Sequence, residues 1–299
     1  MRSKALWIGL RLVALIALPV FAGAQDPDQE DVRGAFLTTR PKASEKPPKS
    51  NTSARPSHHR PSPTPVKPPN PGDGNPAGGK TPDIKPPVNG QRRLGLGMTL
   101  FMRDSNGLAV RVDPNHEFAQ GDRVRVLLET NADGHLYIFN TTDGGSPVMI
   151  YPDPQLDEAG NYIKAHVPFE IPSSLSDEDR LRWFTFDEQA GTERLYFVFS
   201  PEPLKEIPIE EDLVKFCGEK KKGCFWRPDA ELWAGLQKEM DAPSRSDNSQ
   251  KFGKAQTGPE QEATTRGIGL AKEDAEPTMV IMKAASGPVL VTALQLTHK

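Results

Sequence analysis

The sequence lacks the motifs of the common hydrolase classes. It contains no G-x-S-x-G turn for a serine nucleophile, no H-E-x-x-H zinc pair and no EF-hand calcium loop. Its acidic clusters, Asp187-Glu188 and residues 177–179, lie in loop-like segments, where carboxylates usually provide solubility. Loose calcium binding there, or at Asp133 with Asp143, is the alternative. We therefore expect a protein that is not an enzyme and holds no cofactor or metal.

Histidine is scarce and scattered in the part of the sequence with regular hydrophobic patterning. Single histidines occur at predicted turns or strand ends, at His116, His135, His166 and His298. An imidazole in such a place is usually solvated. A hydrolase with an unrecognised site, using Asp187 or His135, is the least favoured reading.

Only two cysteines are present, Cys217 and Cys224. None lies near the N-terminal apolar run, which argues against a lipid-anchored lipoprotein. Two neighbouring thiols in an oxidising compartment most often pair, so we predict a disulfide; a free buried thiol pair is the alternative. A zinc site would need two more ligands nearby, and the sequence offers none with suitable spacing.

The chain also lacks an apolar run long enough to cross a bilayer. The longest N-terminal run, residues 12–21, is too short for about 30 Å of hydrocarbon. Basic residues precede this run and Ala22-Gly23-Ala24 follows it, which is typical of a secretory signal peptide. We predict a signal peptide over 1–24 with cleavage between Ala24 and Gln25, hence export to the periplasm or the extracellular space. An uncleaved membrane anchor is the alternative.

An excess of positive charge is absent too. The chain has a net charge of −3, and removal of the predicted signal leaves 34 basic and 40 acidic residues, a net charge of −6. The folded part is therefore not expected to bind nucleic acid or anionic membranes, which require a concentrated basic face.

Proline, serine, lysine and asparagine dominate residues 25–91. Such a segment buries too little apolar area to offset the entropy of ordering, so we predict a disordered Pro-rich linker that acts as a spacer. Adhesion of its spaced basic residues to anionic cell-wall material is the alternative.

The clearest secondary structure lies between Gly121 and Pro152. Its first run alternates Val124, Val126 and Leu128 with polar residues, as in a strand with one buried face. Turn residues at 131–134 and 142–146 separate three such runs. This pattern predicts an antiparallel meander.

The remaining ordered segments extend this all-β pattern. We predict a hairpin over 94–112, strands at 182–186 and 193–200, a small helical insertion at about 208–241, a mobile loop at about 242–262 and closing strands within 265–297, at 266–270, 279–282 and 289–296. The strand at 193–200 is almost wholly β-branched or aromatic, so both of its faces should be covered. The late strands should complete one antiparallel β-sandwich-like domain over 92–299.

Three stretches carry a family resemblance: GDRVRVLLETNADGHLYIFN at 121–140, MIYP at 149–152 and FTFDEQAGTERLYFVFSPEPL at 184–204. Over about residues 94–204 the chain resembles the bacterial domain-of-unknown-function family 4384. The resemblance implies a β-sandwich-like accessory module of exported or envelope proteins, sometimes fused to caspase-like peptidases or Ser/Thr kinases. It implies no catalytic residues, and we expect no fused enzyme domain in this chain.

Three tryptophans, Trp183, Trp226 and Trp233, are possible ligand-surface aromatics, although their amphipathic placement favours packing. The expected function is a protein-interaction module that binds another envelope or secreted protein while held on the Pro-rich linker. A glycan-binding or cell-wall-binding module, using the tryptophans and the basic linker, is the alternative.

Overall fold

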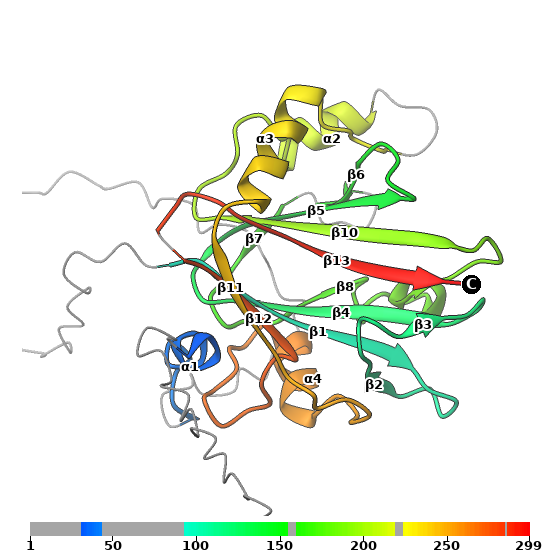
Figure 1. Ribbon diagram of the computed structural model, residues 1–299, viewed down its shortest axis with the longest axis vertical. Helices are drawn as coiled ribbons and strands as arrows, with labels where there is room; N and C mark the ends of the chain where they lie inside the picture. Colours follow the sequence, from blue (N-terminus) through cyan, green and yellow to red (C-terminus); the bar gives the residue numbers. More distant parts are fainter. Residues whose placement is uncertain (1–30, 44–92, 155–159, 219–223, 285) are drawn as a thin grey trace, which may run out of the picture. The chain divides into compact units, whose positions relative to one another are not determined.

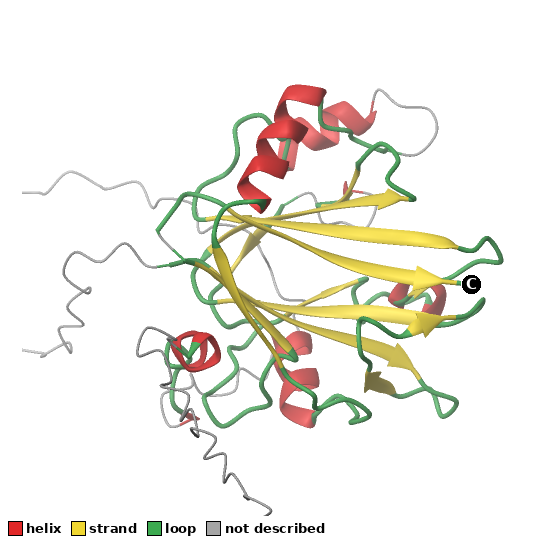
Figure 2. Ribbon diagram, in the orientation of Figure 1, coloured by secondary structure: helices red, strands yellow, loops and turns green. Residues whose placement is uncertain are grey.

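Two β-sheets with helices on their outer faces make up the folded part of the chain (Figures 1 and 2). The computed structural model describes residues 31–43, 93–154, 160–218, 224–284 and 286–299, and residues 32–299 form one packed unit. The predicted signal peptide and its cleavage site at Ala24 and Gln25 lie outside the described residues. No helix within these ranges is long and apolar enough to cross a membrane.

Within the described residues, sheet A has seven strands and sheet B has six. Sheet A contains β11 (Ser244–Asn248), β12 (Met279–Lys283), β1 (Gly95–Arg103), β4 (Arg123–Thr130) and β8 (Phe169–Ile171) in that order, with β2 (Ala109–Arg111) on β1 and β9 (Phe184–Thr185) on β4. Sheet B contains β3 (Glu117–Phe118), β13 (Leu290–His298), β10 (Gly191–Ser200), β5 (Gly134–Thr142) and β6 (Val148–Tyr151) in that order, with β7 (Tyr162–Ile163) on β5.

The strands pair antiparallel, as predicted, except for the short parallel pair of β3 with β13. The core between the sheets contains alternate residues of the strands, such as Leu96 and Met98 of β1 and Leu195 and Phe197 of β10. The intervening residues of β10, including Val198, pack on the opposite side of sheet B against helices. The prediction that this strand is covered on both faces is therefore confirmed.

The predicted meander over 121–152 is wrong at its first turn. β5 and β6 do form a hairpin, with Asp143 and Gly144 at positive φ in its turn. β4 and β5, however, lie in different sheets, so residues 131–133 cross from one sheet to the other. The Asn131 side chain accepts from Gly95 N and donates to Arg93 O, which fastens the crossing to β1 instead of closing a hairpin.

The C-terminal part of the chain departs from two predictions. The expected mobile loop at 242–262 contains strand β11 and the start of helix α4 (Gly258–Arg266), and the expected strand at 266–270 is absent because Gly267 caps α4 in the left-handed conformation. The later two predicted strands exist as β12 and β13. β12 pairs with β1 in sheet A, and β13 pairs with β10 in sheet B, so the chain's end completes both sheets.

The helical insertion forms as predicted, as α2 (Glu210–Gly218) and α3 (Ala230–Met240) over the outer face of sheet B (Figure 1). Asp229 caps α3 by accepting from Leu232 N. Cys217 and Cys224 form the predicted disulfide, which ties the end of α2 to the segment leading into α3.

Replacing both cysteines with serine is expected to lower the free energy of unfolding by about 2 to 3 kcal/mol. The disulfide restricts the conformations of the unfolded chain, and without it the unfolded state gains entropy. Denaturant unfolding of the double variant beside the reduced and oxidised wild type measures this loss. The double variant should match the reduced protein, and equal midpoints for all three proteins would show that the bond contributes nothing.

A short helix, α1 (Val32–Leu37), packs on the outer face of sheet A together with residues 38–43 (Figure 1). We call residues 32–43 the docked segment. Phe36 of this segment is fully buried, and its ring occupies the space that a side chain at Gly95 of β1 would fill; at Gly97, Pro277 lies closer than Phe36. The prediction of an unbroken disordered linker over 25–91 is therefore wrong for the docked segment, and residues 25–30 and 44–91 lie outside the described residues.

The docked segment changes the role expected for the Pro-rich linker. Residue 43 and residue 93 belong to the same packed unit, so residues 44–92 connect two parts of one unit. It therefore does not separate the folded unit from the predicted signal peptide.

Candidate functional site

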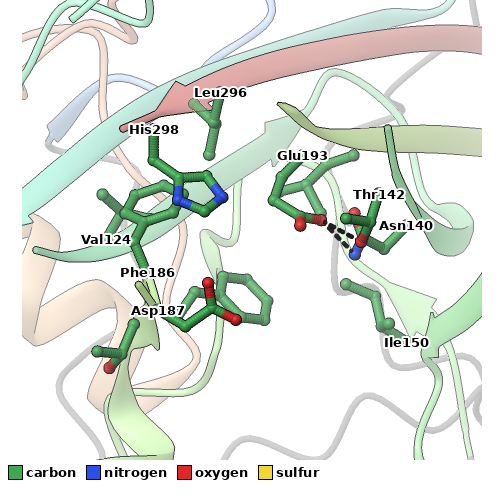
Figure 3. Close-up of a pocket in the computed structure, with 12 residues that line it drawn as sticks. Val124, Asn140, Thr142, Ile150, Phe186, Asp187, Glu193, Leu296 and His298 are labelled. Carbon is green, nitrogen blue, oxygen red and sulfur yellow. Dashed lines mark hydrogen bonds between the residues drawn. The ribbon is translucent and has the colours of Figure 1, made fainter. Parts of the chain in front are cut away.

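One candidate site is a pocket of about 230 Å³ at one end of the sandwich (Figure 3). We call it the inter-sheet pocket, because β4 and β9 of sheet A and β5, β6, β10 and β13 of sheet B all contribute to it. Its lining residues are Val124, Asn140, Thr142, Ile150, Phe184, Thr185, Phe186, Asp187, Glu193, Leu195, Leu296 and His298.

Antiparallel register explains why residues far apart in sequence meet in this pocket. The start of β10 lies beside the ends of β5 and β13, with Glu193 opposite both Thr142 and Leu296. His298 lies two residues beyond Leu296 on the same face of β13, which makes it a diagonal neighbour of Glu193. At this end of the sandwich the apolar core therefore gives way to polar side chains on neighbouring strands, Thr142, Glu193 and His298.

The polar groups of the pocket form a partly completed hydrogen-bond network. Glu193 Oε2 accepts from Asn140 Nδ2 at 2.8 Å and from Thr142 Oγ1 at 3.0 Å, as the dashed lines in Figure 3 mark. Asn140 Oδ1 and His298 Nδ1 are buried and have no hydrogen-bond partner among the described residues. Buried polar atoms without partners are uncommon, since each costs about 1 to 3 kcal/mol.

His298 is held rigidly in this position. Its side chain is almost completely buried, and its ring packs on Phe186 with 4.9 Å between ring centroids. Phe186 in turn stacks on Phe118 at 4.8 Å. The prediction of a solvated imidazole is therefore wrong for His298, because the end of β13 is covered by the segment that follows β9.

Two other histidines also differ from that prediction. His135 is buried, and its Nδ1 lies 2.8 Å from Asn161 Oδ1. His166 is buried between Glu129 and Thr39. His116 alone of the four is exposed, as expected.

The group around His166 has the order of a catalytic triad. His166 Nε2 lies 2.8 Å from Thr39 Oγ1, and its Nδ1 lies 2.7 Å from Glu129 Oε1. However, Arg40 donates two hydrogen bonds to Glu129, and Thr39 Oγ1 donates to Phe36 O, so each member is already engaged in holding the docked segment. The cavity beside it, lined in part by Arg40 and Glu129, measures about 10 Å³, which has no room for a substrate.

The acidic clusters considered in the sequence do not gather around a common point. Asp133 and Asp143 lie at opposite ends of β5 and cannot share one cation. Asp179 forms ion pairs with Arg103 and Arg123. Within the described ranges, no group of three or more His, Cys, Asp or Glu side chains has the arrangement of a metal site.

The three tryptophans do not form a common surface. Trp183 is buried beneath the Arg125 guanidinium, which lies 4.4 Å from the ring centroid. Burial lowers the pKa of Arg125 from its ordinary value, and the nearby Glu170 carboxylate opposes this effect. Trp226 and Trp233 pack against Phe139 on the outer face of sheet B. Their arrangement favours packing over sugar stacking.

The sequence also contains one match to a nucleotide-binding motif that the search for catalytic motifs did not report. Residues 74–81, GNPAGGKT, have the G-x-x-x-x-G-K-T spacing of a phosphate-binding loop. That loop works only between a strand and a helix, and the surrounding sequence is Pro-rich without either pattern. The match lies outside the described residues and carries no functional assignment.

Comparison with known proteins identifies one family. No curated protein and no solved structure matches the chain. A family model described as "Domain of unknown function (DUF4384)" matches residues 117–203, from β3 to just beyond β10. This range is narrower than the 94–204 expected, and it includes the pocket residues of β4, β5, β6, β9 and β10 but not those of β13. The family resemblance is thus confirmed over residues 117–203, where the chain matches the DUF4384 model.

Proposed function

We propose that this chain is a non-enzymatic exported module that binds a group of another envelope or secreted protein in the inter-sheet pocket. The observation that carries the proposal is the lining of this pocket, in which the carboxylates of Asp187 and Glu193 lie among apolar and aromatic side chains. A ligand that entered the pocket would donate hydrogen bonds to these carboxylates and bury apolar surface against the walls.

Two further features support the proposal. The only histidine with a triad-like arrangement, among the described residues, is fully engaged beneath the docked segment. The Cys217–Cys224 disulfide favours an oxidising compartment, in agreement with the predicted signal peptide. Because Trp183 is buried and Trp226 and Trp233 pack against Phe139, we do not carry the glycan-binding alternative further.

The proposal is tested by placing a photo-crosslinking amino acid at Thr185, an exposed residue that lines the pocket. Thr265, exposed on α4 at the outer face of sheet A, is the matched control position. We expect irradiation of cells making the full protein at native level to yield a distinct adduct from position 185 and not from 265. Ile150→Trp, which fills the pocket, should reduce that adduct.

Recovery of monomer alone from both positions would overturn the proposal. An adduct of equal yield at both positions would also overturn it, because it would indicate random collision instead of a site.

A further inference from the structure

The polar groups that face the inter-sheet pocket are mostly hydrogen-bond acceptors. Glu193 and Asp187 contribute carboxylates to its lining. Among the described residues, the Glu193 carboxylate accepts hydrogen bonds from Asn140 and Thr142, and both reach the same oxygen, Oε2. Asp187 accepts the Gln189 amide through Oδ1. A ligand that completes this set must therefore bring several donors.

The charge of the pocket is negative. Its described lining includes two carboxylates and no lysine or arginine. The nearest basic residue in sequence to His298 is Lys299, whose Nζ lies 2.6 Å from Glu117 Oε2 and is thus already paired. In Figure 3 the side chains of Asp187, Glu193 and His298 point toward the same space. An anionic ligand would be repelled there and a cationic one attracted.

The walls of the pocket are apolar and partly aromatic. Phe184 and Phe186 of the segment around β9 face Ile150, Leu195 and Leu296 of sheet B. The Phe186 ring already packs against Phe118 and His298, so the walls act as an apolar surface, which can bury the methylene stem of a long side chain. A volume of about 230 Å³ is sufficient for one such side chain and too small for a folded element.

We propose, resting on the proposed function, that the group bound in this pocket is the side chain of a lysine on the partner protein. Its ammonium donates to the carboxylates of Glu193 and Asp187, and its stem lies between the phenylalanines and the sheet B residues. An ammonium has three donors and no acceptor, which matches the excess of acceptors in the pocket.

The test is a titration of the full mature chain, followed by NMR, with two short capped peptides that differ only in a central lysine or norleucine. Norleucine keeps the stem and loses the charge. We expect the lysine peptide to shift resonances of the pocket residues and to bind at least about tenfold more tightly than the norleucine peptide, as charged hydrogen bonds require.

Matched variants locate the effect. Glu193→Gln and Asp187→Asn keep side-chain shape and remove charge, and each should weaken lysine binding about tenfold without changing norleucine binding. Glu188→Gln removes an adjacent exposed carboxylate that does not line the pocket, and it should leave both affinities within about twofold.

Equal binding of the two peptides would overturn the lysine assignment and leave the pocket as an apolar binding site, so the proposed function would stand. Absence of binding by both would also overturn the assignment, and the crosslinking at Thr185 would then decide the proposed function independently.

Discussion

Replacing Arg40 with alanine is expected to lower the free energy of unfolding by about 3 to 5 kcal/mol, because it leaves a buried carboxylate without its cation. The Arg40 side chain has no exposed surface, and Glu129 is 3% exposed. Two hydrogen bonds of 2.8 and 2.7 Å join the guanidinium to the two Glu129 oxygens. The remaining Arg40 donors reach three backbone oxygens, those of Ala271, Asp274 and Ala275.

Denaturant unfolding measures this loss, and hydrogen exchange of the Arg40 amide, which donates to Leu37 O, reports release of the docked segment. Thr38→Ala is the control in the same segment, because Thr38 is exposed and its hydroxyl bonds within the segment; it should cost less than about 0.5 kcal/mol. The double variant Arg40→Met/Glu129→Met should recover most of the loss, since removing both charges leaves neither one unpaired. A loss below about 1 kcal/mol for Arg40→Ala would show that this ion pair does not hold the segment in place.

The docked segment illustrates what the sequence pattern could not reveal. Its helix has six residues within a Pro-rich region, too few for a hydrophobic period to stand out. The residues that hold it are distant in sequence: Glu129 lies 89 residues further along the chain, and Gly95 leaves space for Phe36. Neither contact leaves a signal near residues 32–43.

Predictions based on local periodicity succeeded where the period was strong. The alternation in β10 and the stripe of Leu232, Trp233 and Leu236 in α3 both led to the observed elements. The turn at 131–134 shows the limit of prediction from local patterns, because turn residues do not indicate which sheet the next strand joins. Gly134 was expected to serve a turn, yet it allows β5 to approach the backbone of Ser200.

The candidate site was beyond sequence reasoning for a similar reason. Asn140, Glu193 and His298 come from three strands, and only the register of β10 with β5 and with β13 brings them together. The one usable signal was the change within β10 from polar residues at 192–194 to apolar residues at 195–199. Glu193 lies on the same face of β10 as Leu195 and Phe197, so its carboxylate lies at the end of the core between the sheets.

Helix α4, by contrast, carried a recognisable signal that the prediction of a mobile loop overlooked. Thr257 and Glu260 have the spacing of a capping box, and Pro259 lies in the first turn. The helix has little apolar surface, with Ala263 as its one buried apolar residue, so a search for hydrophobic periodicity does not find it. Its attachment to sheet A depends instead on Glu260.

Replacing Glu260 with alanine is therefore expected to lower the free energy of unfolding by about 3 to 5 kcal/mol. Glu260 Oε1 accepts from Arg111 Nη2 at 2.5 Å, and both side chains are almost completely buried. Its Oε2 accepts from the backbone amide and the hydroxyl of Thr257, each at 2.8 Å. The substitution thus leaves the Arg111 charge buried beside Phe101 and removes half of the capping box.

Glu260→Gln separates these two contributions, because glutamine keeps a capping-box acceptor and removes the charge; we expect a loss of about 1 to 3 kcal/mol. Glu262→Ala is the matched control on the same helix, since its ion pair with Arg266 is partly exposed, and it should cost less than about 1 kcal/mol. Denaturant unfolding of the three variants gives the comparison. Equal losses in the free energy of unfolding for Glu260→Ala and Glu262→Ala would contradict this prediction. They would show that the ion pair of Glu260 with Arg111 does not hold α4 on sheet A and does not compensate for the small apolar face of the helix.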